Sequence, residues 1–282
     1  MMAEQADAVS KSDIEAVQEW LKTQPHLPAI TESDIKVFLH CNYQDVEAAK
    51  VNIEKYYTFR TSCTDFFTNR DCRDETIQVA MSLSMFSVLP KSTPEGYRVA
   101  YCRLLNPDTT NYVHLHAIRM LVMHLDLWMK EEALAPGHVI LIDMTGMHLG
   151  HLSKIRMGVV KNYSYYTQEA IPIRLKQLHF LNVVSFMDKI MWLAKPFMKK
   201  EIMELIHMHT SIDTLIKYIP LDCLPQEYGG GAGPYEDLNK LYRQKLFDHR
   251  EEFLEEERSK RGHVDESKRI AKPKRYMFGL FG

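Results

Sequence analysis

The chain has 282 residues, a length that suits one large domain or a small and a large one. Its composition, 45% hydrophobic and 26% charged, is that of an ordinary globular protein, and a net charge of −2 excludes a general attraction to nucleic acid or anionic lipid. The N-terminus is too polar and acidic for a signal peptide, and no apolar run approaches the ~18 residues of a membrane span. Five scattered cysteines without CxxC spacing favour free thiols in a reducing compartment. We therefore expect a cytoplasmic protein.

Three amphipathic helices are predicted in the first quarter of the chain. The first begins behind the serine caps of "SKSD", where Ser12 has capping-box spacing to Glu15, and two prolines end it. Thr31 caps the second helix, and the third runs from about Asp45. The sequence therefore predicts a small helical domain over residues 1–74.

Apolar strands alternate with helices over residues 75–238. The segments "GYRVAYCRLL", "VILID" and "KQLHFLNVV" have the composition of strands. A long apolar helix separates the first two segments, and a helix from about Leu152 to Glu169 separates the last two. This alternation is typical of an α/β layer with a mostly parallel sheet.

The strand "VILID" ends in Asp143, three residues before Gly146, and nucleotide enzymes use a similar order to reach a phosphate and its metal ion. The partner motif is missing, because the chain has no Gly-Lys dipeptide and no GxGxxG. We therefore interpret Asp143 as a strand-end carboxylate that accepts backbone N–H groups of the next turn. Gly146 then supplies a backbone conformation that residues with a Cβ disfavour.

Two HxH pairs, His114 with His116 and His207 with His209, are candidates for metal binding, because such pairs share a face on a strand. No third ligand stands at a suitable spacing. No motif of an activated nucleophile, such as GxSxG, occurs either. We therefore expect no metal, no other cofactor and no enzyme activity.

Sixteen methionines are a high number for this length, and many of them fall in apolar segments. Methionine is flexible and fills irregular apolar space. Two interpretations are open: ordinary core filling, or the lining of a cavity for a flexible apolar ligand.

The chain becomes strongly charged after residue 238. Residues 239–282 are predicted to form a charged helix and a tail. About the last 20 residues are expected to be loosely held.

The second half of the chain contains the segments "VILIDMTGMHLGHL", "IPIRLKQLHFLN", "KPFMKKEIMELIHMH" and "LPQEYGGGAG". Together they resemble the CRAL-TRIO lipid-binding family, in particular its branch of alpha-tocopherol transfer protein and cellular retinaldehyde-binding protein. The resemblance covers about Asp13 to Leu238. It implies an α/β fold in which a mostly parallel sheet and helices enclose an apolar pocket, behind a three-helix N-terminal domain. It also implies an intracellular binding and transfer protein for tocopherol, a retinoid, a carotenoid or a related lipid.

The resemblance implies a pocket lined from the central strand, the turn after it, the next helix and the next strand. The residues at these positions are Ile140, Ile142, Leu149, Tyr163, Tyr166, Thr167, Ile173 and Leu178. A lid should extend from Ser185 to about Glu204, with one apolar helical stripe at i, i+4, i+7 and i+11. That stripe is Phe186, Ile190, Leu193 and Phe197. The alternative for the stripe is a permanently packed core helix.

The same branch of the family holds phosphoinositide head groups in a basic cleft. Arg174 and Lys176 match two of these basic positions, whereas Met203 and Leu205 stand where further basic residues are expected. Lys189 and Lys195 are candidates for a different patch on an anionic surface. The expected partners are thus a hydrophobic ligand and a membrane surface, contacted peripherally by a monomer, with no nucleic acid.

Two other classes of function stay open at this point. The same fold could act as a lipid-gated adaptor or regulatory module without a transport role, which the charged C-terminal helix favours. An enzyme that acts on a lipid is the third class, and the lack of an activated nucleophile argues against it.

Overall fold

The computed structural model describes residues 9–260 and 262–270. The strands of the sheet are β1 (Ser84–Val88), β2 (Arg98–Leu104), β3 (His138–Asp143), β4 (Leu175–Leu181) and β5 (Ile206–His209). The longer helices are α1 (Lys11–Lys22), α2 (Glu32–Cys41), α3 (Val46–Ser62), α5 (Glu75–Leu83), α6 (His114–Glu132), α8 (Met157–Tyr165), α9 (Met187–Ala194), α12 (Tyr235–Asp248) and α13 (Arg250–Ser259). Short helices are α4 (Thr64–Phe67), α7 (Leu149–Ser153), α10 (Lys200–Met203) and α11 (Ile212–Leu215).

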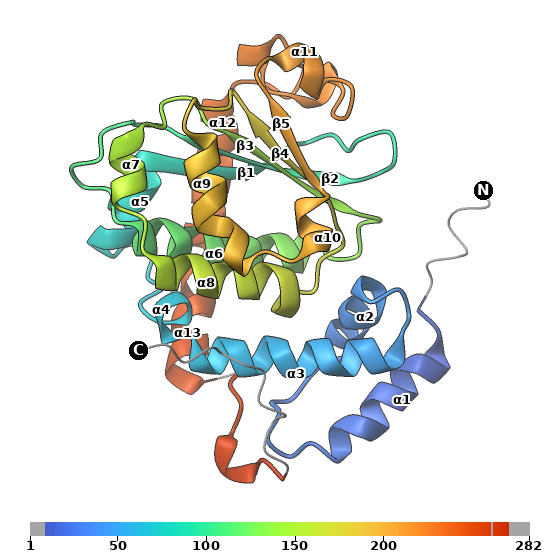
Figure 1. Ribbon diagram of the computed structural model, residues 1–282. Coiled ribbons are helices and arrows are strands. Elements are labelled where there is room, and N and C mark those ends of the chain that lie inside the picture. Colours follow the sequence, from blue (N-terminus) through green and yellow to red (C-terminus); the bar gives the residue numbers. More distant parts are fainter. Residues whose placement is uncertain (1–8, 261, 271–282) are drawn as a thin grey trace.

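The five strands form one sheet in the order β1-β2-β3-β4-β5. β1 is antiparallel to β2, and every other neighbouring pair is parallel. The expectation of an α/β fold with a mostly parallel sheet is therefore confirmed. Helices connect the parallel strands, because a parallel pair needs a crossover connection. Figure 1 shows α9 in front of the sheet, α6 and α8 below it, and α1, α2 and α3 as a further layer below these two helices.

The three predicted N-terminal helices are present and share a core of their own. Thr31 and Asp34 form a complete capping box at the start of α2. The N-cap of α1 is Ser10 and not the predicted Ser12. The Ser10 side chain accepts the backbone N–H of Asp13. The core of this bundle joins the apolar faces of all three helices, at Ile14, Val17, Ile35, Phe38, Leu39, Ala49, Ile53 and Tyr57. The boundaries at residues 74 and 238 stay predictions.

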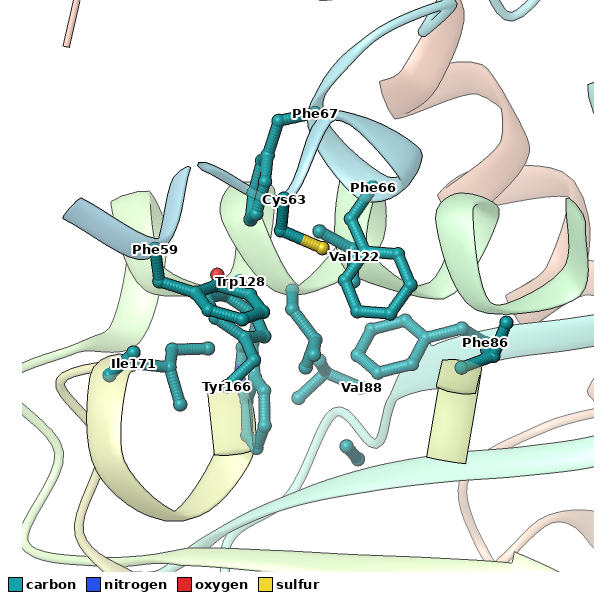
Figure 2. Close-up of a cluster of buried hydrophobic side chains, with 14 of the residues drawn as sticks. Phe59, Cys63, Phe66, Phe67, Phe86, Val88, Val122, Trp128, Tyr166 and Ile171 are labelled. Carbon is teal, nitrogen blue, oxygen red and sulfur yellow. The ribbon is translucent and has the colours of Figure 1, made fainter. Parts of the chain in front are cut away.

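The largest apolar cluster joins α3, α4 and α6 to the sheet. Figure 2 shows Phe59 beside Tyr166, and Phe66 of α4 next to Phe86, which belongs to β1. The rings of Phe59 and Tyr166 are stacked, with centroids 5.6 Å apart. Aromatic contacts of this kind add stability beyond burial alone. The cluster therefore fixes the N-terminal helices on the α/β layer.

The charged C-terminal helices belong to the fold. α12 packs on β1 and α6 and buries Leu238, Tyr242 and Leu246. The expectation of a loosely held end is wrong for the described residues after it, because Val264 is buried in the core of the N-terminal bundle. Arg269 forms ion pairs with Glu54 and Glu266. Residues 271–282 lie outside the described part of the chain.

A buried charge network connects α3, α6 and α13. Arg60 and Arg70 both contact Asp126 and Glu256, with N···O distances from 2.5 to 2.8 Å. Burial disfavours the charged form of Glu256, but the two guanidinium groups outweigh it and lower its pKa to about 2. Removing one member would leave a buried charge without its partner, which typically costs ~3–5 kcal/mol.

Within the described residues, no helix is both long and apolar enough to cross a membrane.

Candidate ligand-binding site

The two faces of the sheet differ in how completely the protein covers them. Cross-strand partners share a face, so Ile140 lies beside Ala100 and Leu178, and Ile142 lies beside Cys102 and Phe180. We call this face, towards α8 and α9, the front face. The opposite, back face carries the alternate residues of the same strands.

The centre of the back face is fully packed. Val99, Tyr101, Val139 and Leu141 are each 0% exposed, in a cluster that also contains Leu215 of α11 and apolar residues around Leu224. On the front face Cys102, Ile140, Ile142, Leu178 and Phe180 are only half-buried. The described side chains therefore leave part of this apolar face uncovered.

One predicted residue of the helix in front joins this face. Tyr163 of α8 is half-buried and lies near Cys102 of β2. Burial raises the pKa of the Cys102 thiol to about 12 and the pKa of the Tyr163 hydroxyl as well, so both groups are neutral at pH 7. The structure thus brings together Ile140, Ile142, Leu178 and Tyr163.

Four other predicted lining residues lie elsewhere. Tyr166 is 0% exposed in the cluster of Figure 2, with its hydroxyl 3.4 Å from Asp126, so it has the position of a core residue. Thr167 and Ile173 line a groove next to the N-terminal bundle, and the Thr167 hydroxyl donates to the carbonyl of Tyr163. Leu149 is 53% exposed at the start of α7.

The predicted lid is not one helix. α9 ends at Ala194, a 3-10 turn covers Lys195–Phe197, and α10 follows. Pro196 explains the break, because its ring lacks an N–H and clashes with the carbonyl four residues earlier. The stripe therefore continues on α9 only through Ile190 and Leu193.

The lid segment carries apolar side chains on both sides. Phe186, Ile190, Leu193 and Phe197 are half-buried. Trp192, on the same helix, is 76% exposed, and Lys189 and Lys195 are exposed as well. Figure 1 shows α9 standing in front of the sheet. The segment thus has an inward half-buried side and an outward side with one large aromatic ring.

The two predicted phosphoinositide residues contact the N-terminal bundle. Arg174 is buried, its Nε donates to the carbonyl of His40 at 2.7 Å, and its guanidinium lies over the ring of Tyr43. Lys176 donates to the hydroxyl of the same tyrosine at 2.7 Å. Beside them an open groove of about 600 Å³ runs between α2, α3 and α10, lined also by Lys55. Met203 and Leu205 are half-buried.

The histidines form stacks. The ring of His179 in β4 lies 4.9 Å from His207 and 5.1 Å from His209, both in β5. Nδ1 of His179 and Nε2 of His209 are 2.9 Å apart, a distance that places a proton between them. Among the described residues no group of three or more His, Cys, Asp or Glu side chains could hold a metal ion.

The interpretation of Asp143 as a structural carboxylate is confirmed. Its Oδ1 accepts the backbone N–H of Thr145 at 2.9 Å, and Gly146 follows with φ +83°. A second partner was missed: the hydroxyl of Tyr228, from the glycine-rich loop, donates to Oδ2 at 2.5 Å. No spacing rule links residues 85 positions apart, although the tyrosine stands in the most specific motif of the chain.

The family models match most of the chain in two pieces. The CRAL/TRIO domain model matches residues 84–230, and the Pinta-like, UBA domain model matches residues 6–77. In structure, the chain is similar to the crystal structure of Sfh5, with a TM-score of 0.50 at 12% identity over 79% of this chain and 88% of that one. This likeness shows the fold.

Curated relatives share the same region. Alpha-tocopherol transfer protein-like of Mus musculus is 27% identical over 86% of this chain and 71% of its own length. The protein of the same name from Homo sapiens is 28% identical over 78% of this chain and 65% of its own length. Clavesin-1 of Xenopus laevis is 24% identical over 79% of this chain and 69% of its own length. Because the CRAL/TRIO match spans more than half of the 282 residues, the chain belongs to the CRAL/TRIO domain family.

Proposed function

We propose that this chain binds one hydrophobic small molecule against the front face of its sheet and exchanges it at membranes. The observation that carries the proposal is the unequal burial of the two faces, because Leu141 is fully covered and its neighbour Ile142 is not. Burying apolar surface is worth ~25 cal/mol per Å². A ligand that covers the half-buried side chains would therefore gain free energy that the protein alone leaves unused.

The polar groups near this face favour a mostly apolar ligand. Tyr163 and Cys102 are neutral at pH 7, so they could hydrogen-bond one hydroxyl or carbonyl but not neutralise a charge. The names of the relatives favour a tocopherol. Retinoids, carotenoids and related lipids fit the same chemistry.

The lid segment gives this cargo a route to a bilayer. Opening would expose the stripe of Phe186, Ile190 and Leu193 to water, which is costly in solution and less so at a membrane. Trp192 already points outward, and tryptophan is favoured at the membrane interface. The membrane should therefore shift the lid towards its open state.

An anionic surface would contact the lid more readily than the groove. Arg174 and Lys176 would have to leave Tyr43 before they could bind a phosphoinositide head group. Lys189 and Lys195 are exposed beside Trp192. We therefore assign the contact with anionic lipid to the lysines of the lid segment.

The adaptor alternative is less well supported by the fold. The charged helix that favoured it, α12, buries three side chains against the rest of the protein. Its exposed side still borders an open groove of about 580 Å³, lined by Tyr235, Lys240 and Arg243 among others. Because truncation after Leu238 would remove core residues, charge reversal at Lys240 and Arg243 is the better test of a protein partner.

Native mass spectrometry and mass spectrometry of the organic extract test the proposal. We expect one small molecule per chain, released by solvent without a covalent bond to break. A protein that carries no ligand and takes up none from a panel of labelled tocopherol, retinoid, carotenoid and fatty acid would contradict it.

A further inference from the structure

The helix in front of the sheet changes its geometry just before β4. α8 ends at Tyr165, and a π-helix covers Tyr166–Ala170. Its widened turn closes with a bond from the N–H of Ile171 to the carbonyl of Tyr166 at 2.9 Å. Single π turns inside helices often occur at functional positions. Here the π-helix directs Gln168 and Glu169 towards the lid segment.

The side-chain amide of Gln168 forms hydrogen bonds through both its nitrogen and its oxygen to residues 197–199 of the lid segment, which we call the hinge. Its Nε2 donates to the carbonyl of Phe197 at 3.1 Å, and its Oε1 accepts the backbone N–H of Lys199 at 2.8 Å. The same Nε2 donates to the carbonyl of Ser164 at 2.9 Å. The opposite orientation of the amide would turn its oxygen towards two carbonyls, so the network itself fixes the orientation.

Glu169 adds an ionic contact to the same place. Its carboxylate forms ion pairs with Lys199 on the hinge and with Lys55 on α3. Glu169 is itself held from α3, because Asn52 donates to its backbone carbonyl at 3.1 Å and to that of Ala170 at 2.9 Å. The hinge, the π-helix and the N-terminal bundle are therefore connected through two consecutive side chains.

We propose that Gln168 and Glu169 form a latch that keeps the lid closed and connects it to the N-terminal bundle. The latch contacts residues 197–199, which are the last residue of the 3-10 turn and the two residues that join it to α10. The C-terminal end of the lid cannot move away from α8 without breaking the two hydrogen bonds of the Gln168 side chain and the ion pair between Lys199 and Glu169. This role rests on the proposed function only where it concerns cargo. The latch itself is a property of the ligand-free chain.

Hydrogen exchange at the hinge tests the latch without any ligand. The amide of Lys199 is protected by Gln168, so Gln168→Ala should raise its exchange about tenfold or more, as expected from the loss of two net hydrogen bonds. Lys199→Gln should raise it by a smaller factor, because Lys199 is 49% exposed and its pair is screened by solvent. Lys200→Gln is the matched control, with the same charge change one residue away and a pair to Glu204 instead.

The outcomes separate the latch from the cargo function. Exchange at residues 197–199 that stays at the parent rate in both Gln168→Ala and Lys199→Gln would overturn the latch. Raised exchange in these variants but not in Lys200→Gln supports it. If Gln168→Ala loses protection throughout the protein, the comparison of Lys199→Gln with the parent decides, because Lys199→Gln changes only an exposed side chain. Raised hinge exchange with unchanged transfer of a fluorescent tocopherol to vesicles supports the latch and counts against transfer through the lid.

Discussion

The hydroxyl of Tyr228 lies 2.5 Å from Oδ2 of Asp143 and ties the glycine-rich loop to the end of the central strand. Asn182 donates to the other oxygen of the same carboxylate at 2.9 Å. Burial alone would raise the pKa of Asp143, but these hydrogen bonds outweigh it and lower the pKa below its usual value. A carboxylate at this strand end therefore organises three loops and needs no metal or phosphate to explain it.

Tyr228→Phe should destabilise the protein. It removes the hydrogen bond to the buried carboxylate of Asp143, which contributes roughly 1.5–3 kcal/mol, and also the contact of 2.9 Å with the hydroxyl of Tyr101. The measurement is the urea midpoint, with the slope of the transition checked for change. Tyr235→Phe is the control, because the ring under the guanidinium of Arg103 stays in place. Equal stability of Tyr228→Phe and the parent would mean that the loop is not held through this bond.

Substitutions on adjacent residues of β3 should have different effects on stability and on binding. Leu141→Ala, on the packed back face, should cost ~2–5 kcal/mol of stability and leave ligand retention unchanged in the folded fraction. Ile142→Asp, and likewise Leu178→Asp, should abolish retention at a smaller cost in stability, because these side chains are not fully covered. Thermal unfolding and ligand titration are measured in parallel. Normal binding by both aspartate variants would remove the front face from the site.

The exposed Trp192 of the lid should affect the rate of transfer to membranes and not the affinity for the ligand. Trp192→Ser should slow transfer of a fluorescent ligand to vesicles several-fold, while the equilibrium dissociation constant stays within about twofold of the parent. Phe186→Ser with Phe197→Ser should slow transfer and weaken binding together, since these residues lie on the inward side. Transfer at the parent rate by both variants would show that the segment does not enter the membrane.

Charge reversal on the lid should act through salt-dependent attraction. Lys189→Glu with Lys195→Glu should weaken transfer to anionic vesicles at low salt and have little effect at high salt, because exposed charges are screened beyond about a Debye length. Neutral vesicles serve as the control. An equal effect at both salt concentrations would point to lost packing instead of lost electrostatic attraction.

The ionic part of the latch should depend on pH with a definite sign. Partial burial raises the pKa of Glu169, but hydrogen bonds from Lys199 and Lys55 outweigh it and lower the pKa below its usual 4.5. A depressed pKa in the folded state contributes stability that is complete above the unfolded value and is lost as the pH falls through the folded value. Glu169→Gln should therefore show faster hinge exchange than the parent at pH 7, by less than tenfold, and converge with it only when the pH falls through the folded-state pKa of Glu169, which lies below 4.5. A difference that grows in acid would contradict this sign.

Local patterns predicted the regular elements but not the irregular ones. The capping box at Thr31 is a contact within one turn, so the sequence contains all of it. The apolar run of β3 predicted a strand, but it did not show that only one face of this strand is fully packed. The first and last strands were not predicted, since β1 follows α5 without a turn between them and β5 has only four residues.

The candidate site was predictable from family resemblance in part. The structure places Ile140 and Leu178 on one face of the sheet, because the alternation of a strand fixes the face of each residue, and their contact with a ligand stays a prediction. Positions on the following helix agree with the prediction only in part, because Tyr163 joins the front face whereas Tyr166, at the start of the π-helix, is a core residue. The lid was wrongly expected to be one helix, although Pro196 was visible as the breaking point.

The burial of Val264 among the first helices bears on how the protein is made. The core of the N-terminal bundle contains this side chain, and the backbone N–H of Val264 donates to Thr61 at 2.7 Å. A bundle that forms from α1, α2 and α3 during synthesis therefore lacks one of its own core residues until Val264 has left the ribosome. Domains usually fold in order from the N-terminus. Here a helical bundle that is synthesised before the sheet is completed after it, so a chain that stops short of Val264 also has an incompletely formed bundle.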